Sequence, residues 1–253
     1  TLTFAQTESP VINTGECLVA VKAIGINRAD LLQKAGHYPP PAGESDILGI
    51  EMAGVVQQVC DSESNLNIGD KVYGLVPGGA YAEVVKVQTN HLMKLPEHFS
   101  YELGAATAEV FLTAYQCLFT IAKLKKGEKV LIHAGASGVG TAAIQLAKQY
   151  GCEVTVTVSN QEKAQACLTL GAVHAILYTE VNFVEWAKQH NPVGFNVIID
   201  VVAGNYVNKN IDVAAVDSRI IILSMLGGRF TENVDVAKLL MKRIQLIGST
   251  LRN

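Results

Sequence analysis

The sequence predicts an α/β protein with two domains: a barrel-like β domain over residues 1–109 and a doubly wound parallel sheet over residues 110–253. The first stretch consists of short β-type runs separated by turn signals, a spacing typical of compact barrels. From about residue 110, nearly unbroken apolar runs alternate with amphipathic helical stretches, which indicates parallel strands covered on both faces. Hydrophobic residues make up 49% of the chain and charged residues 17%, so the chain can bury a sizeable core.

In the first stretch, apolar runs are expected to form the strands of the barrel. They are CLVAVKAIGI (17–26), GVVQQVC (54–60), DKVYGLV (70–76) and YAEVVKV (81–87). The turn signals IGDK (68–71) and PGGA (77–80) place glycine where a positive φ is useful. The proline-rich segment YPPPAG (38–43) cannot form a helix or a central strand, so we expect an exposed, stiff loop.

In the second stretch, strands and helices are expected to alternate. The expected strands are KVLIHA (129–134), EVTVTV (153–158), HAILY (174–178), FNVIIDVV (195–202), RIIILSML (219–226) and IQLIGST (244–250). The expected helices are VGTAAIQLAKQY (139–150), NQEKAQACLTL (160–170), NFVEWAKQH (182–190) and VDVAKLLMKR (234–243). The domain boundary is expected near the helical stretch TAEVFLTAYQCLF (107–119).

Charge and cysteine usage narrow the partners and the compartment. The 20 Lys and Arg residues against 23 Asp and Glu residues give a net charge of −3 without a long run of either sign, so neither nucleic acid nor an anionic membrane is expected as the main partner. The 5 cysteines form no CxxC pair, which argues against a disulfide framework and predicts a cytoplasmic location. Because the chain starts at Thr1 without Met and stops at Asn253, we expect both ends to be cut from a longer protein.

The motif HAGASGVG lies between the apolar run KVLI and a helical stretch. Its pattern of Gly135, Ser137 and Gly140 is a dinucleotide-binding turn with serine at the second glycine. The first glycine allows a tight turn, the last lets the helix pack close to the strand, and the small middle residue lets backbone amides reach a pyrophosphate. We therefore expect cofactor contacts from Gly135, Ser137, Gly138, Val139 and Gly140. The alternative is a glycine-rich turn that binds no ligand.

The end of the second strand decides which dinucleotide is expected. NAD-binding folds usually place an acidic residue there, about 20 residues past the motif, to hold the ribose hydroxyls. Here the strand EVTVTV is followed by Ser159 and Asn160, with Lys163 one turn further on. Without a carboxylate to repel a 2′-phosphate, NADP(H) is favoured over NAD(H). The alternative is that Ser159 and Glu162 form a helix capping box and that Lys163 is an ordinary solvated residue.

Taken together, these motifs resemble a known family. GINRADLLQKAGHYPPP (25–41), LGIEMAGVV (48–56), IGDKVYG (68–74) and HAGASGVGTAAIQLAK (133–148) look like the medium-chain dehydrogenase/reductase superfamily. Within it they resemble the zinc-free quinone oxidoreductases, closest to the p53-inducible quinone oxidoreductase group. The resemblance implies a GroES-like first domain, a Rossmann second domain with the cofactor between them, and a C-terminal segment beyond this chain. It also implies a homodimer, whose edge would come from the strands RIIILSML and IQLIGST.

Compared with the zinc enzymes of that superfamily, this chain lacks metal ligands. Those enzymes have a cysteine where this chain has Asn27, and a His-Glu pair where it has Ile50 and Glu51. Asn27 and Ile50 cannot supply the converging ligands that zinc needs, so no metal site is expected. The histidines outside this region show no metal-binding spacing and are expected in the core or on the surface. They are His91, His98, His133, His174 and His190.

The resemblance also implies roles for individual residues. Asn27 and Tyr38 would lie beside the substrate, with Ser137 near both the substrate and the cofactor, where hydrogen bonds can stabilise a developing oxyanion. Each has a structural alternative: Asn27 bonding to backbone, Tyr38 packing on its loop, and Ser137 as a turn residue. Further cofactor contacts are implied for Thr113, Tyr178 and Gly227, together with Ser159 and Lys163.

The function that the resemblance implies is hydride transfer from NADPH to a quinone without zinc. The same motifs fit a reductase of 2-alkenals or enones, which would use the same hydride on another acceptor. A third possibility is a structural or RNA-binding protein that binds NADPH without turnover. The absence of a basic stripe argues against RNA.

Overall fold

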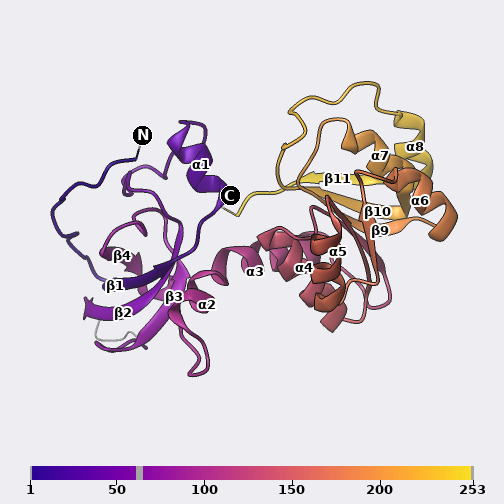
Figure 1. The fold of residues 1–253 in the computed structure, drawn as a ribbon. Coiled ribbons are helices and arrows are strands. Elements are labelled where there is room, and N and C mark those ends of the chain that lie inside the picture. Colours follow the sequence, from indigo (N-terminus) through magenta and orange to yellow (C-terminus); the bar gives the residue numbers. More distant parts are fainter. Residues whose placement is uncertain (1, 61–64, 252–253) are drawn as a thin grey trace. The chain divides into compact units, whose positions relative to one another are not determined.

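The computed structural model of the chain describes residues 2–60 and 65–251. It separates into two compact units, Thr1–Glu109 and Val110–Asn253, and each unit is described by itself (Figure 1). Among the described residues, no helix combines the length and the apolar character that crossing a membrane would require.

Unit 1 contains a five-stranded antiparallel sheet in the order β4-β1-β2-β3-β5. Its strands are β1 (Glu16–Ile24), β2 (Glu51–Val59), β3 (Lys71–Leu75), β4 (Val84–Gln88) and β5 (Leu92–Lys94). Alternate side chains of these strands form the core, including Val19, Met52 and Val72, none of which is exposed to solvent. The unit also contains two short α-helices, α1 (Arg28–Lys34) and α2 (Tyr101–Ala105), and a 3-10 turn over Thr89–His91. Residues 38–43 form neither helix nor strand, which confirms the loop expected for the proline-rich segment.

Unit 2 contains a six-stranded parallel sheet in the order β11-β10-β9-β6-β7-β8, which confirms the predicted fold class. Its strands are β6 (Lys129–His133), β7 (Glu153–Val158), β8 (His174–Leu177), β9 (Phe195–Asp200), β10 (Ala214–Ile222) and β11 (Gln245–Gly248). The order reverses between β6 and β9, which lie side by side although two strands separate them in the sequence. In open α/β sheets, ligands bind at the carboxyl ends of the strands beside such a reversal.

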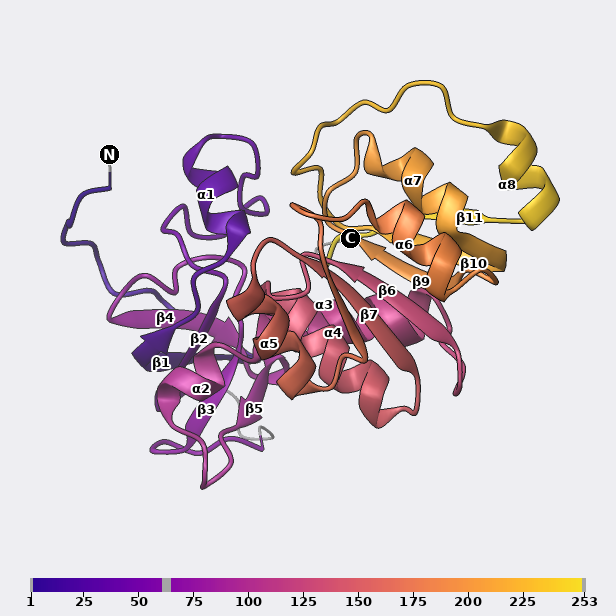
Figure 2. The same cartoon turned by 45° about the vertical axis from the view of Figure 1, so that its right-hand side comes forward.

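Helices cover both faces of this sheet. They are α3 (Ala108–Tyr115), α4 (Gly138–Gln149), α5 (Gln161–Leu170), α6 (Phe183–His190), α7 (Tyr206–Val213) and α8 (Val236–Lys242), with a π-helical turn over Gln116–Ile121 after α3. Figure 2 shows α4 and α5 on one face of the sheet and α6 and α7 on the other. Successive residues of β6 pack on opposite faces: Val130 and Ile132 with α3, α4 and α5, and Leu131 with α6 and α7. This burial on both faces explains why the strands read as continuous apolar runs.

In the second half, one expected strand was too long and one helix was not predicted. β10 ends at Ile222, four residues before the end of the expected strand, because the chain then turns and the Gly227 amide donates to the Val202 carbonyl at 2.7 Å. Helix α7 was not expected, because its sequence YVNKNIDV is rich in asparagine and β-branched residues that form helices poorly. It is stabilised by tertiary packing, since Val207 and Ile211 are buried against the sheet.

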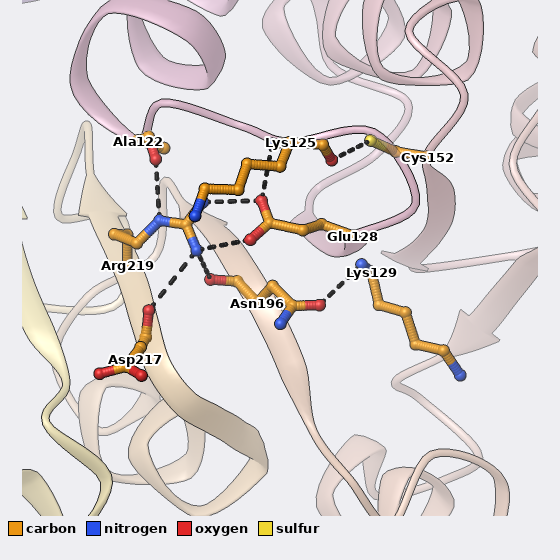
Figure 3. Close-up of polar contacts among 8 residues, drawn as sticks. All are labelled: Ala122, Lys125, Glu128, Lys129, Cys152, Asn196, Asp217 and Arg219. Atoms are coloured by element: carbon orange, nitrogen blue, oxygen red, sulfur yellow. Dashed lines mark hydrogen bonds and ion pairs between the residues drawn. The ribbon is translucent and has the colours of Figure 1, made fainter.

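A polar cluster joins the amino ends of β6, β9 and β10 (Figure 3). The Arg219 guanidinium forms two bonds to the Glu128 carboxylate, at 2.9 and 2.7 Å, and its Nε donates to the Ala122 carbonyl at 2.8 Å. The Lys129 amide donates to the Asn196 side chain at 2.9 Å. Burial raises the pKa of Glu128, but the hydrogen bonds and charges of Arg219 and Lys125 together outweigh burial, so the net pKa is lowered. This end of the sheet lies opposite the edge where ligands bind, so the cluster is structural.

Candidate functional site

The turn from β6 into α4 is held by a serine cap. Ser137 has φ −74° and ψ 164°, and its Oγ accepts a hydrogen bond from the Gly140 amide at 3.1 Å. Ser137 is therefore the N-cap of α4, a position where serine is preferred. Its hydroxyl proton can still be donated to another group, because the oxygen acts only as an acceptor in this bond. The cap explains a serine in the turn and does not exclude a ligand.

The glycines of this turn lie where a side chain would collide. A Cβ on Gly135 would be 2.5 Å from the Val156 Cβ, and a Cβ on Gly140 would be 2.5 Å from the Gly135 carbonyl oxygen. A Cβ on Gly138 would be 2.7 Å from Val110 Cγ1. The backbone of α4 can therefore start directly against β6 and β7. The first amides of any helix lack intrahelical acceptors and lie at the positive end of its dipole, and in α4 these amides include those of Gly138 and Val139.

The end of β7 carries a bonded serine and lysine. Lys163 Nζ donates to Ser159 Oγ at 3.1 Å, and Thr179 Oγ1 donates to the Ser159 carbonyl at 3.2 Å. The alternative, a capping box of Ser159 and Glu162, is not what the structure shows, because Asn160 is the N-cap of α5, and its Oδ1 accepts from the Lys163 amide at 2.9 Å. Since Asn160 caps the helix, the Ser159 hydroxyl is left to bond with the lysine side chain.

Tyr178 follows β8 and lies next to this pair in the sheet. Its amide donates to the Val158 carbonyl at 3.1 Å, which places it beside the end of β7, and its side chain is 46% exposed. The Tyr178 backbone thus lies beside the end of β7 that carries Ser159. Tyr178 also lines a pocket with Tyr206 and Lys209 of α7.

Two further candidates of unit 2, Gly227 and Thr113, lie outside the turn after β6 and the end of β7. Gly227 is in the loop after β10, bonded through its amide to the loop after β9. That contact is close, because a Cβ on Gly204 would be 2.7 Å from the Gly227 carbonyl oxygen. Thr113 is buried on α3. The loops after β9 and β10 are therefore joined by hydrogen bonds at the carboxyl ends of the strands.

In unit 1, Asn27 is held by two carboxylates. Its side-chain amide donates to Glu51 Oε1 at 2.7 Å and its backbone amide donates to Asp30 Oδ2 at 2.7 Å. Glu51 Oε2 accepts from the Glu109 amide at 2.8 Å, and Glu51 is only 2% exposed. Burial raises the pKa of Glu51, although the bonds from Glu109 and Asn27 act in the opposite direction. Tyr38 lies half-buried in the loop that follows α1.

Sequence reasoning mentioned Glu51 only as the remnant of a zinc motif and did not foresee that it orients Asn27. The one sequence feature that goes with this arrangement is the glycine at position 25, because a Cβ there would overlap the Glu51 carboxylate. Ile50 is buried and has no ligand atom in its side chain. Over residues 2–60 and 65–251, no group of three or more His, Cys, Asp or Glu residues is arranged to hold a metal ion.

Two family models match the chain. The "alcohol dehydrogenase GroES-like domain" matches residues 13–97, and the "zinc-binding dehydrogenase" family matches residues 138–253. The human quinone oxidoreductase is 30% identical over 244 residues, which cover 96% of this chain and 73% of that protein. The zebrafish (Danio rerio) synaptic vesicle membrane protein VAT-1 homolog is 31% identical over 232 residues, but the chain spans only 48% of its length.

Solved structures share the fold. The Escherichia coli quinone oxidoreductase, in complex with NADPH, has a TM-score of 0.85 at 31% identity, covering 97% of this chain and 76% of that one. The CurK enoyl reductase has a TM-score of 0.84 at 25% identity, covering 98% of this chain and 76% of that one.

Proposed function

Because the chain belongs to the medium-chain dehydrogenase/reductase superfamily of oxidoreductases, we propose that it reduces quinones with hydride from NADPH and without zinc. The observation that supports NADPH most directly is the bonded pair of Ser159 and Lys163 at the end of β7. A cation and a hydroxyl suit a 2′-phosphate, whereas the acidic residue of NAD-binding folds would repel it.

The residues of unit 2 fit such a dinucleotide. The cradle at Gly135, Gly138 and Gly140 is one that side chains would fill, so the backbone is open to close approach by a pyrophosphate. In this proposal the amides of Gly138 and Val139 bind the pyrophosphate, while Ser159, Lys163 and Tyr178 hold the adenosine end. The bound nicotinamide would supply the hydride. Thr113 and Gly227 are proposed to lie at the nicotinamide end.

The substrate oxygen needs hydrogen-bond donors where negative charge develops. We assign this role to Asn27 and Tyr38, with Ser137 as a donor near the cofactor. Asn27 Nδ2 donates one proton to Glu51 Oε1, with 2.7 Å between the two atoms, and this bond fixes the orientation of the amide group. The second proton on Nδ2 can then be donated to the substrate in a fixed direction. Zinc is not needed in this scheme, because quinones are electron-poor, and neither Asn27 nor Ile50 is a zinc ligand.

A second acceptor class is favoured by one finding. The CurK enoyl reductase shares the fold, and conjugated carbonyls accept hydride in the same way as quinones. Initial rates of NADPH oxidation with 1,2-naphthoquinone and with a 2-alkenal, each repeated with NADH, separate the two. Faster turnover of the quinone supports our proposal, and faster turnover of the alkenal replaces it. Binding of NADPH without turnover of either acceptor would indicate a binding protein.

The choice of cofactor can be reversed at Ser159. Replacing Ser159 with Asp is expected to raise the KM for NADPH about 100-fold and to lower the KM for NADH, because the new carboxylate repels the 2′-phosphate and pairs with Lys163. Lys163→Ala is expected to weaken NADPH about tenfold and to leave NADH unchanged. Lys188 is an exposed residue of α6, so Lys188→Ala is the matched control and should change neither KM. An unchanged ratio of the two KM values in Ser159→Asp would remove the assignment.

We also propose that the protein is a cytoplasmic homodimer. In the sheet formed by the described residues, β11 is an edge strand, and an edge strand can pair with the same strand of a second copy. β10 cannot share this edge, because β9 and β11 pair with it on either side. Gel filtration with light scattering should give twice the chain mass over a wide concentration range. The variant Leu246→Pro, which disrupts β11, should give a monomer. A monomer in the unmodified protein contradicts the proposal.

A further inference from the structure

A chain of hydrogen bonds lies buried at the carboxyl ends of the strands in unit 2. His133 ends β6, and its Nδ1 is 2.9 Å from Thr157 Oγ1 on β7. Its Nε2 is 2.7 Å from Asn210 Oδ1 on α7, and Asn210 Nδ2 donates to Asp200 Oδ2 at 2.9 Å. His133, Asn210 and Asp200 are fully buried, and Thr157 is 1% exposed.

In this chain of hydrogen bonds, the donor and the acceptor of each bond can be assigned. Asn210 uses its NH₂ group toward Asp200, so its carbonyl oxygen must accept a proton from His133 Nε2. The neutral ring then accepts the Thr157 hydroxyl proton at Nδ1. Burial lowers the pKa of His133, which favours this neutral form. Each buried polar group in the chain thus has a partner, as burial of polar groups requires.

The chain of hydrogen bonds ends at Asp200, in the turn after β9. The second oxygen of Asp200 accepts hydrogen bonds from the amides of Val202, at 2.7 Å, and Ala203, at 2.9 Å. Ala203 has a φ of +55°, a conformation that alanine rarely adopts without support. The Val202 carbonyl in turn accepts the Gly227 amide at 2.7 Å. The carboxylate therefore fixes the loop after β9, and this loop fixes the loop after β10.

The bonds also cross the point where the strand order reverses. Thr157 and His133 belong to the half of the sheet that begins with the glycine-rich turn, whereas Asp200 and Gly227 belong to the half that begins with β9. In dinucleotide-binding sheets the two halves each hold one mononucleotide across this reversal. The end of β7, with Ser159 and Lys163, lies in the first half, so the loops after β9 and β10 are left for the other nucleotide.

We propose that Asn210, together with His133 and Asp200, is a positioning residue for the nicotinamide half of the cofactor. The bonded chain ties the loops that carry Val202 and Gly227 to the half of the sheet that holds the adenosine. Asn210 acts through these loops and touches no reacting atom. This inference rests on the proposed function, because it takes the dinucleotide as the ligand.

The test compares a whole cofactor with its adenosine end. Asn210→Leu keeps the size of the side chain and removes both of its hydrogen bonds. We expect it to raise the Kd for NADPH about tenfold and to leave the Kd for 2′,5′-ADP within about twofold, both measured by calorimetry. Ile211→Ala is the matched control, since Ile211 is the buried neighbour on α7 and makes no polar contact in its side chain. It should change the two constants by equal factors.

Two further variants keep the proposal falsifiable if Asn210→Leu does not fold. Thr157→Val keeps the shape of the side chain and removes only the hydroxyl at the far end, so it should show the same selective loss for NADPH to a smaller degree. His133→Gln retains a donor toward Asn210 and should bind NADPH better than His133→Leu. An equal loss for both ligands, or no loss for either, in the variants that fold overturns the proposal.

The two hypotheses fail in different ways. If the unmodified protein binds neither NADPH nor 2′,5′-ADP, the proposed function is wrong. If it binds both and the variants do not discriminate between them, the proposed function stands and the positioning role is wrong.

Discussion

Replacing Gly140 with alanine is expected to raise the Kd for NADPH at least about 100-fold and to lower the melting temperature. The new Cβ would lie 2.5 Å from the Gly135 carbonyl oxygen and 2.7 Å from the Ala134 carbonyl oxygen. Both are backbone atoms that cannot rotate away, so α4 must move off the turn, and its amide groups would leave the position that we propose for the phosphate. Calorimetric titration with NADPH and thermal unfolding measure the two effects.

The expected loss of stability in Gly140→Ala has the opposite sign to the usual effect of this substitution in a helix. Glycine to alanine inside a helix normally stabilises a protein by about 1 kcal/mol, because alanine is the better helix former. A loss of stability therefore requires the collision seen at this position. Gln145→Ala is the matched control, since Gln145 is exposed on the same helix α4, and both measurements should stay nearly unchanged. NADPH binding by Gly140→Ala within about threefold of the original would contradict the account of the turn.

Replacing Arg219 with methionine is expected to lower the free energy of unfolding of unit 2 by about 3 kcal/mol. The substitution keeps an apolar stem and leaves the Glu128 carboxylate, whose side chain is only 15% exposed, without its bidentate partner. The Ala122 carbonyl loses its donor as well. Urea unfolding followed by circular dichroism measures the change. Lys188→Met breaks the exposed pair with Glu185 and should cost less than about 0.5 kcal/mol.

The effect of Arg219→Met should also depend on pH. The folded pKa of Glu128 is lowered below its ordinary value of 4.5, so the unfolded chain binds the proton more readily at acid pH. The ion pair therefore stabilises the protein fully above pH 4.5, and this stabilisation is lost as the pH falls through the folded pKa. The difference between the original protein and Arg219→Met should shrink over that range. A difference that is constant down to strongly acid pH would show that packing, not charge, is lost.

Local patterns determined much of this fold. Apolar runs such as KVLIHA and EVTVTV have to be buried on both faces, so they predict parallel strands without knowledge of their partners. The turn around Gly135 and Gly140 follows from the need of a helix to start against a strand, and small residues are its direct signature. The absence of an acidic residue after β7 could also be seen in the sequence, because it depends only on the residues that follow this strand directly.

Tertiary structure alone decided the features that join distant segments. Helix α7 forms from a poor helical sequence because Val207 and Ile211 find a buried place on the sheet. The end of β10 is set by bonds to the loop after β9. The chain from His133 to Asn210 spans 77 positions of sequence. Periodicity reports only what a segment buries, whereas a hydrogen bond between distant side chains depends on where the completed fold places both partners.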